Sequence, residues 1–155
     1  MTTKKTRLIG LGNSILTDDG VGVVVARRLQ QALPMDCGLD IVESEVGGFD
    51  LMEMLVGFTH VILVDAVQFD GVAPGTIVRI KPEDLHTSLR LRSVHEIDLP
   101  TVLGLGKELG YAMPESIEIY AIQAQDMITF GERLNPCVAA AAEQVIREIT
   151  AQAVS

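Results

Sequence analysis

The sequence has little of what several classes of protein need. Its only two cysteines, Cys37 and Cys137, lie far apart in no paired motif, which predicts reduced thiols and a cytoplasmic protein. Twelve basic residues against 21 acidic ones give a net charge of −9, which argues against a nucleic-acid binder, because such proteins present a basic face. No apolar run approaches the roughly 18 residues of a membrane helix, so no membrane insertion is expected. The short, glycine-broken run after Met1–Arg7 does not match a signal peptide.

Several motifs of nucleotide binding and catalysis are also missing. The sequence has no Walker loop, no G-x-S-x-G elbow and no cysteine in a catalytic signature. It also offers no nucleophile–base dyad that would support an acyl-enzyme. Gly10 and Gly12 are similar to the start of a dinucleotide fingerprint, but Ile15 occupies the place of the third glycine. Asp18 and Asp19 would repel a phosphate there, which argues against a Rossmann-like binder of small molecules.

What is present predicts one α/β domain over residues 1–155. The chain is 48% hydrophobic, which is enough to build a single core. Short apolar or alternating segments predict strands at 7–12, 39–44, 61–66, 76–80 and 116–122. Apolar residues at helical spacing predict helices at 19–33, 49–56, 97–109 and 135–149. This alternation predicts a three-layer α/β/α sandwich with a mostly parallel, twisted sheet and one antiparallel edge strand.

Polar residues and prolines mark the expected helix starts. Asp18 and Asp19 favour the start of the first helix through capping and the helix dipole. Pro100 fits the first turn of the third helix. Asn135 and Pro136 are expected at the cap and first position of the last helix.

Three polar residues fall where such a sheet exposes its carboxyl ends, the edge at which open α/β proteins keep their sites. Asp19 follows the first strand, Asp65 ends the central strand, and His95 precedes a helix. Two carboxylates and an imidazole suit a divalent transition metal, which can polarise a carbonyl or lower the pKa of bound water. The same residues also allow plainer interpretations. Asp19 could be a helix cap, Asp65 an acceptor of backbone hydrogen bonds, and His95 an ordinary loop histidine.

The segment from Gly10 to Gly22, Gly-Leu-Gly-Asn-Ser-Ile-Leu-Thr-Asp-Asp-Gly-Val-Gly, resembles the N-terminal signature of the nickel–iron hydrogenase maturation proteases. Three shorter segments match that family in the same order: the strand 61–66 that ends in an acid, Ser93-Val-His95 before an amphipathic helix, and Leu134-Asn-Pro136. The likeness extends along nearly the whole chain.

The resemblance implies an endopeptidase that removes the C-terminal extension of the hydrogenase large-subunit precursor after nickel has been inserted. The family's metal-contacting residues, matched position by position, fall on Asp19, Asp65 and His95, with nickel supplied by the precursor. Many members have Glu where this chain has the shorter Asp19. The resemblance also favours a monomer that meets its substrate transiently. A non-catalytic nickel sensor or chaperone remains an alternative, because the three ligands alone could serve it.

One segment departs from the family pattern. The family commonly has Gly-Gly-Thr or Gly-Thr after the second strand, where this chain has Ser44-Glu-Val-Gly-Gly48. The loop 46–50 and the polar segment 81–94 flank the predicted crevice and are candidates for substrate contact. Gly47 and Gly48, like Gly12 and Gly20, could allow close backbone approach or positive φ angles. The departure puts in doubt which hydrogenase is served, more than the type of reaction.

Overall fold

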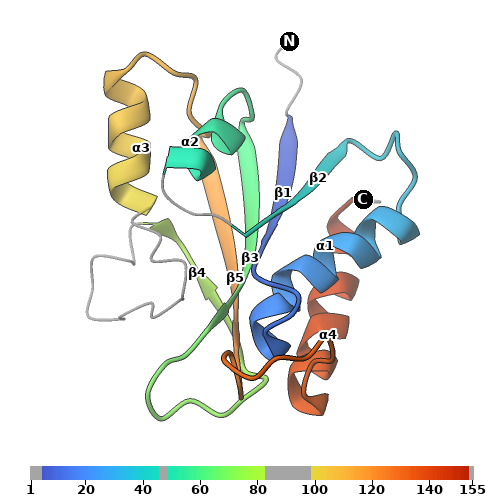
Figure 1. Ribbon diagram of the computed structural model, residues 1–155. Helices are drawn as coiled ribbons and strands as arrows, with labels where there is room; N and C mark the ends of the chain where they lie inside the picture. The colour runs from blue at the N-terminus through green and yellow to red at the C-terminus, as the bar shows by residue number, and fades with distance from the viewer. Residues whose placement is uncertain (1–4, 46–48, 83–98, 154–155) are drawn as a thin grey trace.

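A computed structural model describes residues 5–45, 49–82 and 99–153. The elements along the chain are β1 (Thr6–Leu11), the 3₁₀ turn η1 (Thr17–Gly20), α1 (Val21–Ala32), β2 (Leu39–Ser44), α2 (Phe49–Leu55), β3 (His60–Val67), β4 (Ile77–Ile80), α3 (Leu99–Glu108), β5 (Ser116–Gln123) and α4 (Pro136–Ala153). The strands form one sheet in the order β2-β1-β3-β5-β4, in which β4 alone runs antiparallel (Figure 1). The predicted fold class is therefore confirmed.

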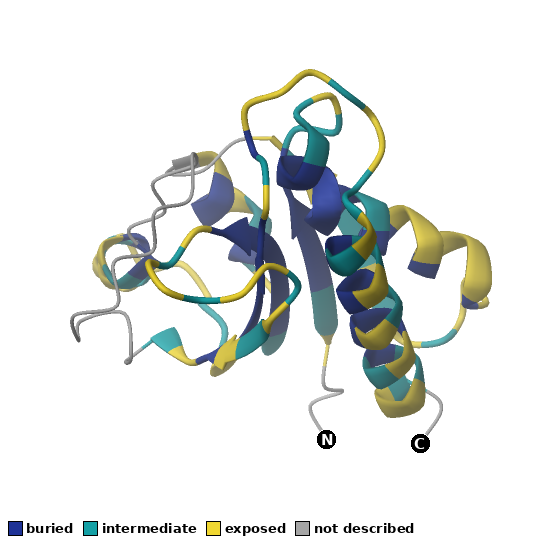
Figure 2. Ribbon diagram, turned by 90° about the horizontal axis from the view of Figure 1, so that it is seen from below, coloured by how far each residue is buried: buried dark blue, intermediate teal, exposed yellow. Residues whose placement is uncertain are grey.

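Helices cover both faces of the sheet and create two apolar cores. One core lies under α1 and α4, and the other lies under α2 and α3. The central strand β3 is buried from Val61 to Val67, as its unbroken aliphatic run predicts. Figure 2 shows the strands mostly buried and the helices exposed on their outer sides. In the part of the chain that the structure describes, no helix is long and apolar enough to cross a membrane.

The helix starts predicted from Pro100 and Pro136 are correct, whereas the start predicted from Asp18 and Asp19 is wrong. Pro136 is the first residue of α4, and Pro100 is the second residue of α3. Asp18 and Asp19, however, lie in η1, and α1 begins after Gly20 with no side-chain cap. Their carboxylates are used in other contacts, described below.

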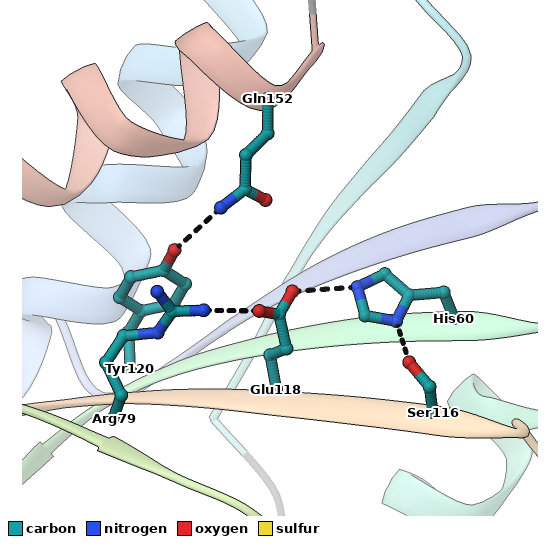
Figure 3. A network of polar contacts seen from close by, with 6 residues as sticks. All are labelled: His60, Arg79, Ser116, Glu118, Tyr120 and Gln152. Carbon is teal, nitrogen blue, oxygen red and sulfur yellow. Dashed lines mark hydrogen bonds and ion pairs between the residues drawn. The ribbon is translucent and has the colours of Figure 1, made fainter.

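A chain of polar contacts runs from the amino ends of β3 and β5 toward the middle of the sheet (Figure 3). His60 bonds through Nδ1 to the Ser116 hydroxyl and through Nε2, at 2.9 Å, to Glu118, which also pairs with Arg79. The Arg79 guanidinium lies 4.4 Å from the centre of the Tyr120 ring. The network joins β3, β4 and β5, and its Ser116–His60 end lies at the edge opposite the predicted site.

The structure also brings Ser116 and His60 together, a contact that the sequence does not reveal. The two residues are far apart in the chain but directly opposite each other in the β3–β5 ladder. They line a cavity of about 660 Å³ that reaches Gln152 near the end of α4. The pair is thus remote from Asp65, which lies five residues further along β3.

Candidate active site

Asp19 and Asp65 come from separate segments and reach the same edge of the sheet, the one at which β1 and β3 end. The ladder between β1 and β3 ends at the pair Gly10–Val64, so Asp65 is the first β3 residue beyond it. Strand β3 itself runs from His60 to Val67, so it extends the predicted strand 61–66 by one residue at each end, and Asp65 lies two residues before its end. Asp19 belongs to η1, which follows β1 and packs against β3.

Glycines make this close approach of η1 and α1 to the sheet possible. A methyl group at Gly22 would lie 2.2 Å from the Val64 carbonyl oxygen and 2.4 Å from that of Leu11. Gly12 has a φ of +146°, and a side chain there would lie 2.0 Å from the Asp19 carbonyl oxygen. The start of α1 therefore lies directly on the ends of β1 and β3, and this fixes the backbone of Asp19.

Both carboxylates are largely removed from solvent. Asp19 is fully buried, and its Oδ2 accepts a hydrogen bond of 2.9 Å from the backbone N–H of Asn13. Asp65 is 5% exposed, and its Oδ1 accepts a 2.9 Å bond from the N–H of Ala66. Because α1 has no side-chain cap, the alternative interpretation of Asp19 as a helix cap is wrong. The interpretation of Asp65 as an acceptor of a backbone bond is correct for one of its oxygens.

Asp18 has a structural task that the sequence does not reveal. It is fully buried, and its two oxygens accept four hydrogen bonds of 2.8–2.9 Å. The donors are the backbone N–H groups of Gln125, Asp126 and Asn135 and the Asn135 side-chain amide. The carboxylate thus holds both ends of the loop between β5 and α4 against η1. No local pattern indicates this role, because the partners are 107–117 residues away.

A second set of contacts joins the loop between β1 and η1 to the loop between β5 and α4. Thr17 donates its backbone N–H to the Gly131 carbonyl at 2.9 Å, and the Gly131 N–H bonds to the Ile15 carbonyl at 2.8 Å. Thr17 has a φ of +49°, an unfavourable conformation for a β-branched residue. Its hydroxyl donates to the Thr129 carbonyl at 2.5 Å. These bonds compensate for the strain and keep the residue before the acid pair in place.

Gln123 secures the other loop at this edge and was not identified from the sequence. Its side chain, 5% exposed, accepts from the Phe69 N–H at 2.9 Å and donates to the Phe69 carbonyl at 3.2 Å. The loop between β3 and β4 is therefore fixed close to the end of β3, which lies two residues beyond Asp65.

His95 lies outside the described residues, as do Gly47, Gly48 and most of the segment 81–94. Among the residues that the structure does describe, no three His, Cys, Asp or Glu side chains come together as a metal site. The structure thus brings Asp19 and Asp65 to one edge, and the third member of the predicted set stays a prediction.

The comparisons with known proteins identify the family of the chain. The family model described as hydrogenase maturation protease matches residues 23–152. The chain belongs to the hydrogenase maturation protease family. The matched range includes Asp65 and His95 and begins four residues after Asp19.

Individual relatives extend the likeness over most of the chain. The hydrogenase expression/formation protein HupD of Rhodobacter capsulatus is 25% identical, over 96% of this chain and 72% of the relative. The hydrogenase 2 maturation protease of Escherichia coli is 26% identical, over 72% of this chain and 74% of its own length. Among solved structures, the E. coli maturating endopeptidase HybD superposes with a TM-score of 0.78 at 24% identity, covering 96% of this chain and 91% of HybD.

Family membership makes the protein an endopeptidase, that is, a hydrolase of peptide bonds. The resemblance stated from the sequence is confirmed. The two alternatives, a Rossmann-like small-molecule binder and a non-catalytic nickel sensor or chaperone, are not favoured.

Proposed function

We propose that this endopeptidase removes the C-terminal extension from the nickel-loaded precursor of a nickel–iron hydrogenase large subunit. We further propose that Asp19, Asp65 and His95 contact the nickel that the precursor carries. Membership of the family supports the reaction. The observation that carries the site is that two nearly buried carboxylates from separate segments reach the same edge of the sheet.

The chemistry of the donor set fits nickel held by cysteines of the precursor. Carboxylate and imidazole groups bind nickel well, and a carboxylate shielded from water attracts a cation more strongly than an exposed one. By contacting that nickel, Asp19, Asp65 and His95 would hold the precursor with its scissile peptide at the carboxyl edge. The metal would supply Lewis-acid polarisation of the attacking water there.

A second role for the acids fits the same reaction. Either Asp19 or Asp65 could take a proton from the attacking water as general base, with nickel only positioning the substrate. The two roles predict different kinetics. Loss of a metal contact raises KM, whereas loss of a general base lowers kcat and leaves KM unchanged.

The central experiment mixes the protein with a nickel-loaded precursor and follows the mass of the large subunit. The wild type should release the tail as one fragment, and D19N, D65N and H95A should each release none. Asn preserves one acceptor oxygen, so the Asn13 bond to residue 19 can persist and the fold is retained. D36N, at an exposed acid in the loop before β2, is the matched control and should process normally. Full processing by D19N or D65N would refute the site.

The Ser116–His60 pair allows a second control. If water attacks the peptide directly, S116A should process the precursor at the wild-type rate, because the pair lies at the opposite edge. Loss of processing in S116A, with the fold intact by circular dichroism, would show that the reaction runs through a serine instead.

A further inference from the structure

Three large apolar side chains stand in solvent beside the proposed site. Ile128 is 82% exposed, Phe130 is 80% exposed and Ile15 is 47% exposed. Together they leave on the order of a few hundred Å² of apolar surface in water, the size at which a patch marks an interaction site. We call these three residues the rim patch.

The rim patch lies on two segments that run side by side. Leu16 and Gly131 form a parallel bridge, and the Gly131 N–H bonds to the Ile15 carbonyl at 2.8 Å. The first of these segments continues directly into η1, which contains Asp19. The patch is therefore continuous with the edge at which the proposed function places the scissile peptide.

The backbone beneath the patch is fixed rather than loose. The buried carboxylate of Asp18 holds residues 125, 126 and 135, on both sides of the exposed side chains. Asp126 in turn accepts hydrogen bonds from the N–H groups of Ile128 and Thr129 at 2.9 and 3.0 Å. A hydrogen bond from the Thr129 side chain, followed by these two backbone bonds, holds the pKa of Asp126 below its usual range. Apolar groups on a preorganised backbone lose little entropy on binding.

We infer that the rim patch is a docking surface for the large-subunit precursor, and that it contacts an apolar area of the folded precursor beside the tail. This inference rests on the proposed function. An endopeptidase that acts on a folded protein must cover the surface next to its site, and aromatic residues such as Phe130 are enriched at protein–protein interfaces.

The first test compares Michaelis kinetics of the I128S/F130S double variant with those of M35S/L109S. The control pair carries apolar side chains that are 104% and 55% exposed, at segments leading into the amino edge of the sheet. The rim variant should raise KM for the nickel-loaded precursor about tenfold or more, with kcat unchanged. The control pair should change neither constant. An unchanged KM in the rim variant, with the wild type active, would overturn the docking surface and leave the proposed function standing.

The second test does not depend on cleavage. Phe130→p-benzoylphenylalanine should cross-link to the precursor on irradiation, and the same group at Leu109 should not. Cross-linking without tail removal would support the surface and refute the proteolytic assignment. Absence of both would overturn both.

A second copy of the chain is the competing occupant of the rim patch. Sedimentation of the protein alone should give a monomer. A dimer that I128S/F130S dissociates, combined with an unchanged KM, would assign the patch to self-association and overturn the inference.

Discussion

Replacement of Asp18 by alanine tests how the edge of the sheet is held together. The substitution removes an acceptor of four hydrogen bonds and leaves three backbone N–H groups without their partner. Bonds to a charged group contribute about 1.5–3 kcal/mol each. Water can reach the partly buried donors after truncation, so we expect a loss of about 4 kcal/mol rather than the full sum.

Such a loss is a large share of the about 5–15 kcal/mol that holds a domain of this size folded. With a urea m value of about 2 kcal/mol/M, the unfolding midpoint should fall by about 2 M at unchanged m. D36A, at an exposed acid before β2, should leave the midpoint within about 0.3 M. A loss below about 1 kcal/mol in D18A would refute the reasoning, because the carboxylate would then not hold the loop.

Three further predictions concern packing and pH. G22A should lower the free energy of unfolding by about 3 kcal/mol or prevent folding, because its methyl would overlap two carbonyl oxygens of the sheet. A methyl group at Gly104 in α3 would meet no atom within 4 Å, so G104A should raise the free energy of unfolding by about 0.5–1 kcal/mol. Thermal unfolding of G22A and G104A therefore separates the effect of crowding from that of helix propensity. The hydrogen bonds that depress the pKa of Asp126 stabilise its turn fully above the unfolded pKa of about 3.9, and this contribution should be lost as the pH falls from there through the lower folded pKa. Hydrogen exchange at the Ile128 and Thr129 amides should detect this loss as a decrease in protection of the wild type, with D126N as the reference. Wild-type protection that acid does not change would contradict the prediction.

The order of elements was predictable because each has a clear local period. The aliphatic run 61–66 indicates a strand buried on both faces, and β3 takes that place at the centre of the sheet. Pro100 and Pro136 locate helix starts through their fixed φ and missing N–H. The short β4 at the edge, antiparallel to β5, also agrees with the prediction.

The candidate site was predictable only in outline. The rule that sites lie at the carboxyl ends of strands placed Asp19 and Asp65 at one edge, and the structure confirms that placement. The sequence alone could not predict that Asp18 holds a distant loop while Asp19 does not. The hydrogen-bond partners of Asp18 lie more than 100 residues away in the chain. The helix-cap prediction was wrong for the same reason. The Asp18 carboxylate accepts long-range hydrogen bonds instead of capping α1. The rim patch was missed because exposure of Ile128 and Phe130 depends on the tertiary fold.

The glycine-mediated contact of α1 with the sheet has a consequence for how such an enzyme diversifies. With Gly22 against the ends of β1 and β3, the segment that carries Asp19 has no room to shift or to accept a larger residue. The loops after β3 and β5 project beyond this contact and can change at their tips without disturbing it. Adaptation to a new partner should therefore accumulate in those two loops, while the chemistry stays as it is.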